Sequence, residues 1–366
     1  MSVPTFVAAA VAQIQRFDRR IAIAGLVGLL IIGTLVHVAS WRGDAELTKQ
    51  DIFYIWLEGH RIVEGENPYA RVLVGDMSRN NKYATYFPLS YVLSAAPQLL
   101  GFADFPEWIA MWHATSLVLT LSITVLLFAA LFKRVSPIAA LVGAAFWLLN
   151  RWSLIVSSVA HVDPLPIALL LVGMLLLETR PRLACITFGV SLAVKQVAIF
   201  LLPLFLVQVW LSAEERPWRH VGRAIMSILA VPVIVSIPFF LWGPEGFIKS
   251  IVFSATRNPD TNLGAPSFDA VVAGRLWSAF GGLPARVPML LLMTLICVVV
   301  LRRNVGFFLA ALLIMVTFVD FNSVLFRQYM AWVAALVPLA MCDFGKSRSA
   351  DRSTLRPDAF TTQGGG

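Results

Sequence analysis

Long apolar runs alternate with short polar stretches along almost the whole chain. Runs of about 17 to 25 residues contain almost no Asp, Glu, Lys or Arg, and a helix of that length can cross about 30 Å of hydrocarbon. We therefore predict an all-α polytopic membrane protein with about ten transmembrane helices. The expected crossings are residues 21–40, 107–132, 136–152, 164–178, 182–194, 197–212, 222–242, 286–302, 304–319 and 325–342.

Polar segments set the limits of the predicted membrane domain. The apolar run after QRFDRR lacks a small-x-small cleavage site, so we interpret it as an uncleaved first helix. We expect one transmembrane domain over residues 1–342 and, because the C-terminal residues are polar, a disordered cytoplasmic tail over residues 343–366. Residues 41–106 then form the first exoplasmic loop, and residues 243–285 form a second large one.

Basic residues predict how the chain threads, because cytoplasmic loops carry an excess of Lys and Arg. If residues 88–101 form a surface helix and residues 182–212 a helical hairpin, all six basic clusters lie on the cytoplasmic side, and we prefer this threading. In the alternative, residues 88–101 cross and residues 182–212 form one continuous helix, which puts FKR and ETRPR outside. The six clusters are QRFDRR, FKR, ETRPR, EERPWRHVGR, RR and KSRSADR.

The composition excludes a soluble domain and argues against nucleic-acid binding. Of the residues, 58% are hydrophobic and 14% are charged, and the net charge of +8 is explained by the basic loops. Cys185, Cys297 and Cys342 have neither a disulfide framework nor metal-ligand spacing, and no Gly-rich phosphate loop occurs. We expect no metal, no cofactor and no nucleic-acid partner.

The segment 49–72 carries many charges for a connecting loop. On a helical projection its apolar and polar residues fall on opposite faces, which predicts an amphipathic helix in the membrane interface, followed by Gly65 and a rigid NPY turn. A surface helix with solvated charges is the simplest interpretation. The apolar stripe is Ile52, Ile55, Trp56, Gly59 and Val63, and the polar face is Asp51, Tyr54, Glu58 and Arg61.

The order of motifs in this loop resembles the first outer loop of the GT-C glycosyltransferases. An acid precedes about a dozen helical residues, a Gly, NPY and then YATYFPLSYVL. The resemblance is closest to glycosyltransferase family 87, the polyprenyl-phosphate-mannose-dependent mannosyltransferases, and continues through HVDPLPIALLLVGMLLLE, FGVSLAVKQVAIFLLPLFLV and FRQYMAWVAALVPLA. The family often has Gly-Gln at Ala160-His161 and Tyr-Pro-Pro at Tyr86-Phe87-Pro88, so the sugar and the acceptor stay open.

The resemblance implies an enzyme that moves a sugar, expected to be mannose, from a polyprenyl-phosphate donor to a lipid or glycan acceptor, with inversion. It implies a monomer in the bacterial inner (plasma) membrane, surrounded by lipid and with its active site facing the periplasm. The leaving phosphate is weakly basic, so one carboxylate suffices as general base and contributes about 10²- to 10⁴-fold. By resemblance this base is Asp51, and Asp44 is its rival.

Cations and polar side chains on the outer face are the candidate substrate contacts. Lys195, Arg257 and Arg327 are expected to bind the donor phosphate. Snorkelling to head groups is the alternative for Lys195 and Arg327, and Arg327 also has Asp320 as a possible partner. Helix capping is the alternative for His161 and Asp163, and interfacial anchoring is the alternative for Lys82 and Tyr86. The expected sugar or acceptor contacts are Tyr54, Tyr69, Lys82, Tyr86, His161, Asp163, Gln196 and Gln328.

A transporter or flippase of a lipid-linked sugar is the competing class. Transporters tend to contain internal repeats with broken helices in matching positions, and the two halves of this chain show no such repeat. Two large outer loops with short inner ones favour an enzyme whose active site faces outward.

Overall fold

The computed structural model describes residues 3–75, 82–256, 260–261, 268, 271–272, 277, 284–322 and 324–354. Nearly all of them are helical, which confirms the all-α class, and a short parallel pair joins β1 (Asp260–Thr261) to β2 (Val324–Leu325). The helices are α1 (Val3–Ala39), α2 (Asp44–Leu47), α3 (Asp51–Val63), α4 (Arg71–Val74), α5 (Leu89–Leu99), α6 (Phe105–Arg134), α7 (Pro137–Leu149), α8 (Arg151–Ser158), α9 (Pro164–Leu176), α10 (Pro181–Val194), η2 (Gln196–Leu201), α11 (Leu202–Ser212), α12 (Pro217–Trp242), α13 (Pro244–Thr256), η4 (Pro284–Arg286), α15 (Val287–Leu301), α16 (Phe307–Phe321) and α17 (Tyr329–Thr354).

The apolar helices make the chain a multi-pass membrane protein. In the described part, residues 19–39 of α1, together with α6 and α12, are long and apolar enough to cross a membrane alone. Helices α7 and α8 form a fourth candidate that bends by 44° at Asn150, whose side chain caps α8 by accepting from the backbone of Trp152 and Ser153. Six shorter apolar helices complete the bundle, and the number of ten crossings stays a prediction.

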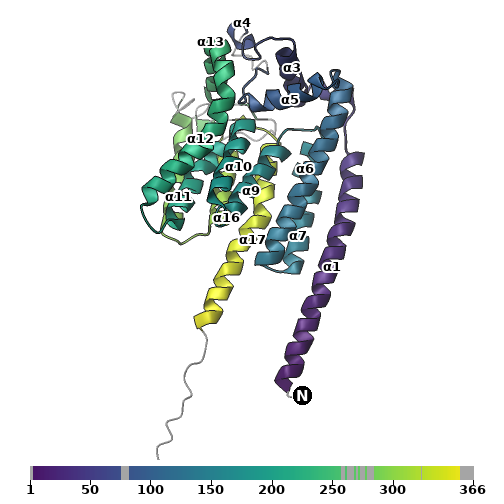
Figure 1. Ribbon diagram of the computed structural model, residues 1–366, viewed down its shortest axis with the longest axis vertical. Coiled ribbons are helices and arrows are strands. Elements are labelled where there is room, and N and C mark those ends of the chain that lie inside the picture. The colour runs from purple at the N-terminus through teal and green to yellow at the C-terminus, as the bar shows by residue number, and fades with distance from the viewer. Residues whose placement is uncertain are drawn as a thin grey trace, which may run out of the picture.

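Several basic clusters meet at one end of the bundle. The Arg19 guanidinium lies 5.3 Å from the ring centre of Phe132, so the first cluster is beside the second. Arg134 lies 3.6 Å from the Glu178 carboxylate and 5.3 Å from the ring centre of Phe308, which adds the third cluster and the start of α16. This is the end that carries the N-terminus in Figure 1. The alternative threading separates the first two clusters, so these contacts favour the preferred one.

The first predicted outer loop lies at the opposite end. Figure 1 shows α3, α4, α5 and α13 together there. Helix α3 covers the predicted 51–63, and Gly65 follows it at φ +77°, a left-handed conformation that glycine adopts at low cost. Helix α5 lies within residues 88–101, where a surface helix was expected, and it packs on α3.

The faces of α3 differ in part from the expected surface helix. Its apolar stripe packs on protein, since Ile52 and Ile55 are buried against α5 and α6. Glu58, assigned to the solvated polar face, is only 1% exposed. A hydrophobic cluster fixes the helix in place; it consists of Leu47, Ile52, Ile55, Tyr69, Ala84, Tyr91, Phe105, Trp108, Ile109, Trp112, Val159, Ala160, Val162, Val194 and Phe239.

The last helix extends past the predicted end of the membrane domain. Helix α17 continues from Tyr329 to Thr354, so the chain is still helical beyond residue 342, where the disordered tail was expected to begin. Its apolar part ends at Asp343, whose carboxylate accepts from the backbone N–H of Leu309, 2.8 Å away, in the first turn of α16. Residues 355–366 lie outside the described residues.

Candidate active site

A cavity of about 740 Å³ lies between the outer-loop helices and the bundle. Its walls come from α3, residues 82–91, the break between α10 and η2 at Lys195, α12, α13 and the α16–α17 connection. Polar side chains of α3 and of residues 82–86 line one part of the cavity, and side chains of η2, α12, α13 and α16, most of them apolar, line another. Half of the twelve predicted site residues line it: Asp51, Tyr54, Lys82, Tyr86, Lys195 and Gln196.

Asp51 is the carboxylate at the polar end of this cavity. It is the first residue of α3 and follows extended backbone at Gln50, so its side chain lies at the positive end of the helix dipole. Lys82 Nζ donates to Oδ1, and Gln328 Nε2 donates to Oδ2 at 3.3 Å. Burial alone would raise the pKa of Asp51, but the positive charges, Lys82 foremost, outweigh it and leave the pKa below its ordinary value. Asp51 is therefore ionised at neutral pH.

Lys195 occupies the break between α10 and η2. Its backbone is extended, at φ −150° and ψ 126°, and its Nζ lies 2.8 Å from each carboxylate oxygen of Asp163. Trp332 Nε1 donates to the same carboxylate at 2.7 Å. The ammonium also lies 5.2 Å from the ring centre of Tyr86 and 5.8 Å from that of Tyr329. Lys195 thus reaches the cavity with its charge already paired inside the protein.

Three other predicted residues support the cavity wall. Gln196 Nε2 donates to the backbone oxygen of Thr85. Tyr69 is buried beneath the wall, and its hydroxyl donates to the backbone oxygen of Tyr86 at 2.8 Å. Gln328 is buried and reaches the cavity through Asp51. These contacts connect residues far apart in the sequence at the polar end of the cavity.

Two of the remaining predicted residues, His161 and Arg327, are not among the lining residues of the described chain. His161 is partly buried between α8 and α9, and burial lowers its pKa although Asp163 and Asp51 oppose the shift. Arg327 is exposed. Arg257 lies outside the described residues.

Sequence reasoning missed several lining residues. Glu58 lies two turns after Asp51 on one face of α3, a spacing visible in the sequence, but its burial was not expected. Arg286, Asn322 and Tyr329 come from distant segments and carry no local motif that points to the cavity. Within the described ranges, no group of three or more His, Cys, Asp and Glu side chains could hold a metal ion.

Fold and cavity together define a multi-pass helical membrane protein with a charged pocket at one end of the bundle and an apolar wall below it. No protein-family model matches the chain. Over 307 residues it is 28% identical to GPI alpha-1,4-mannosyltransferase I, catalytic subunit, of Danio rerio, covering 79% of this chain and 72% of the relative. The similarity supports a membrane glycosyltransferase of the mannosyltransferase superfamily and does not extend to family 87.

Proposed function

We propose that the protein moves mannose from a polyprenyl-phosphate donor to a lipid or glycan acceptor on the exoplasmic face, with inversion. The observation that carries this proposal is an ionised carboxylate, Asp51, next to the ammonium of Lys82 at the polar end of a largely apolar cavity. The similarity to a mannosyltransferase supports the sugar. The sequence resemblance to family 87 supports the donor type and the bacterial inner membrane.

The apolar wall suits a prenyl chain. Side chains of α12 and η2 line the cavity and are solvent-accessible, and we propose that the cavity opens sideways between these helices. Because α12 carries no charged residue after Arg223, this opening would face lipid tails rather than water. The side chains that share both properties are Ile199, Leu229, Val233, Ile237 and Phe240.

The polar end suits the chemistry of transfer. The hydroxyl oxygen of the acceptor attacks the anomeric carbon, and Asp51 accepts the proton of that hydroxyl. The bond from that carbon to the phosphate oxygen breaks at the same time, and the phosphate leaves with the electron pair, so attack from the opposite side inverts the configuration. General-base assistance of this kind contributes about 10²- to 10⁴-fold.

Cations near Asp51 would hold the leaving phosphate. We assign this role to Lys82 and Lys195, whose charges both act on Asp51, and Arg286 is a further cation in the cavity lining. Lys82 is the more accessible of the two lysines, with a side chain 38% exposed against 3% for Lys195. Arg327 and Arg257 remain proposed contacts for the donor phosphate.

A transfer assay tests the function. Purified protein is incubated with polyprenyl-phosphate [³H]mannose and a lipid extract of the cells, and new mannosylated product is measured. Asp51→Asn should reduce product formation by about 10²-fold or more, because the amide cannot accept the proton. Asp44→Asn is the matched control, since Asp44 is exposed in α2 and is not a lining residue. Robust transfer by Asp51→Asn, or loss confined to Asp44→Asn, contradicts the assignment.

The same protein in vesicles tests the transporter alternative. If labelled donor moves between leaflets while no mannosylated product forms, the protein is a flippase and the proposed chemistry is wrong. Nothing in the similarity to the Danio rerio relative favours that outcome.

A further inference from the structure

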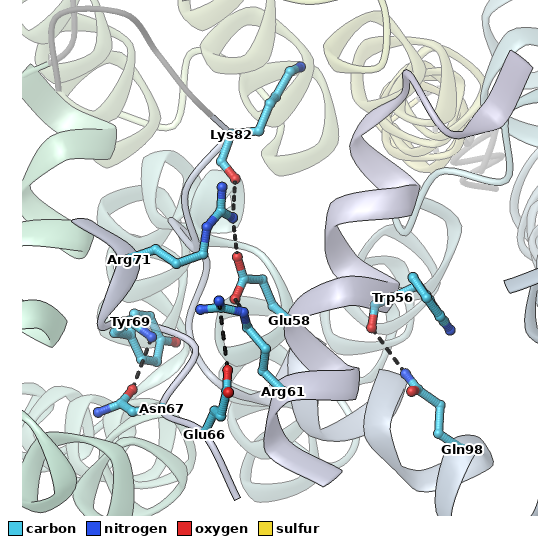
Figure 2. A network of polar contacts seen from close by, with 9 residues as sticks. All are labelled: Trp56, Glu58, Arg61, Glu66, Asn67, Tyr69, Arg71, Lys82 and Gln98. Carbon is cyan, nitrogen blue, oxygen red and sulfur yellow. Dashed lines mark hydrogen bonds and ion pairs between the residues drawn. The ribbon is translucent and has the colours of Figure 1, made fainter. Parts of the chain in front are cut away.

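Two acidic side chains of α3, Glu58 and Asp51, are linked to each other through Arg71 and Lys82. Glu58 Oε1 accepts from Arg71 Nη1, and the same Nη1 lies 3.4 Å from the backbone oxygen of Lys82. The Lys82 ammonium then donates to Asp51, which precedes Glu58 by two turns of the same helix. Figure 2 shows Arg71 between Glu58 and the Lys82 carbonyl, with the Lys82 side chain extending away from them. Lys82 is thus attached to α3 through both its backbone and its ammonium.

Burial makes the Glu58–Arg71 contact the dominant one at Glu58. The carboxylate is almost fully buried, and a buried charge is tolerated only when a close partner compensates it. Arg61 is a weaker partner, with Nε 4.0 Å from Glu58 and Nη2 3.7 Å from Glu66. Burial raises the pKa of Glu58, although the hydrogen bond and charge of Arg71 oppose this.

The backbone of Lys82 needs such an attachment. Its φ is +54°, a left-handed conformation that costs a residue with a Cβ free energy unless surrounding contacts hold it. Arg71 contacts the carbonyl at this position, and Asp51 contacts the ammonium. The direction of the Lys82 side chain therefore depends on both ends of the chain of contacts.

We infer that Glu58 and Arg71 are positioning residues that hold Lys82 beside Asp51. Glu58 fixes Arg71, Arg71 fixes the Lys82 carbonyl, and the ammonium is thereby directed to the carboxylate at the start of α3. The consequence for catalysis rests on the proposed function: Lys82 keeps Asp51 ionised and places a cation where the donor phosphate would arrive.

Lysine acylation tests this positioning without requiring transfer activity. The full-length protein in detergent is treated with sulfo-NHS-acetate, and the acetylation rate of Lys82 is measured by peptide mass spectrometry, with the exposed Lys49 as internal reference. Glu58→Gln keeps the size of the side chain but removes its charge, so it should raise the Lys82 rate by about threefold or more. Asp51→Asn, which removes the ion pair directly, is the positive control.

Arg61→Met is the matched control, because it removes the weaker partner of Glu58 and does not reach Lys82. Its Lys82 rate should equal that of the wild type. Arg71→Met should behave as Glu58→Gln, and the double variant Glu58→Gln/Arg71→Met covers the case in which an unpaired Glu58 prevents folding. An unchanged Lys82 rate in folded Glu58→Gln, together with a raised rate in Asp51→Asn, overturns the inference.

The catalytic consequence is measured separately. In the transfer assay, Glu58→Gln should lower kcat/KM and move the acid limb of its pH profile to higher pH. In the Lys82→Met background, Glu58→Gln should cause no further shift, because Glu58 acts through Lys82. The charged groups that face Asp51 are Lys82, Lys195 and His161, and those that face Glu58 are Arg71, Arg61 and Glu66. Raised acylation in a protein without transfer activity supports the positioning and contradicts only the proposed function.

Discussion

The Lys195 ammonium donates to both carboxylate oxygens of Asp163 at 2.8 Å, and the two side chains are 3% and 1% exposed. The pair connects the start of α9 to the break after α10, and Trp332 extends the contact to α17. The sequence predicted Lys195 as a contact of the donor phosphate, and the loss of such a contact would weaken donor use without unfolding the protein. Burial changes this expectation, since a lone Asp163 carboxylate would remain inside the protein.

Lys195→Ala should therefore destabilise the protein by about 3–5 kcal/mol, because breaking a buried ion pair leaves an uncompensated charge. Replacing both partners, as in Asp163→Leu/Lys195→Met, should cost clearly less. The measurement is thermal unfolding in detergent, followed by tryptophan fluorescence. If the single variant unfolds at the wild-type temperature, Lys195 and Asp163 do not form the pair described here.

The pH dependence of transfer follows from the charges around Asp51. The pKa of Asp51 in the folded protein lies below the ordinary value of 3.8. Ionised Asp51 therefore contributes to the free energy of unfolding above pH 3.8, and this contribution is lost as pH falls through the lower pKa of the folded protein. The carboxylate acts as a base only above its folded pKa. The pH–rate profile of transfer should therefore show no decline due to Asp51, that is no acid limb, above about pH 5. Lys82→Met removes the foremost lowering charge and should move the limb upward.

The direction of this shift is checked by measuring the residual transfer activity of Lys82→Met from acid to neutral pH. The control is Lys249→Met, since Lys249 forms an exposed pair with Glu245 within α13 and is not a lining residue. A limb at lower pH in Lys82→Met than in the wild type would mean that Lys82 does not stabilise the ionised form of Asp51.

The orientation of the bundle can be tested by cysteine labelling in intact cells. Val74→Cys and Lys249→Cys place exposed thiols at the end that carries α4 and α13, and Trp218→Cys places one at the start of α12. The first two should react with an impermeant thiol reagent and the third should not, because the basic clusters are expected to be cytoplasmic. The three native cysteines are buried, which keeps the background low. Labelling of the α12 variant alone inverts the orientation.

Close packing of α10 on α12 gives a stability prediction. A Cβ at Gly189 would lie 2.4 Å from the backbone oxygen of Ile228, so Gly189→Ala must displace one helix and should cost about 1–3 kcal/mol. Gly222→Ala is the matched control, since no atom lies within 4 Å of its Cβ position and the substitution favours helix. Equal unfolding temperatures for the two variants would contradict the packing.

Local patterns in the sequence predicted the elements of the site but not its contacts. The helix 51–63 and its end before Gly65 follow from periodicity and a single glycine, and the structure confirms both. The burial of Glu58 could not be predicted, because a helical projection separates two faces without indicating what packs on each. Asp163 and Lys195 were expected as separate substrate contacts, and their pairing depends on how two helices meet in three dimensions.

The opening that we propose between α12 and η2 would also decide how small molecules reach the cavity. Access through lipid means that the effective concentration of an inhibitor is set by its partition coefficient, so potency should follow lipophilicity as well as fit to the pocket. Detergent alkyl chains would enter by the same route and would compete for the same space. Affinities measured in micelles will therefore be weaker than those measured in lipid nanodiscs.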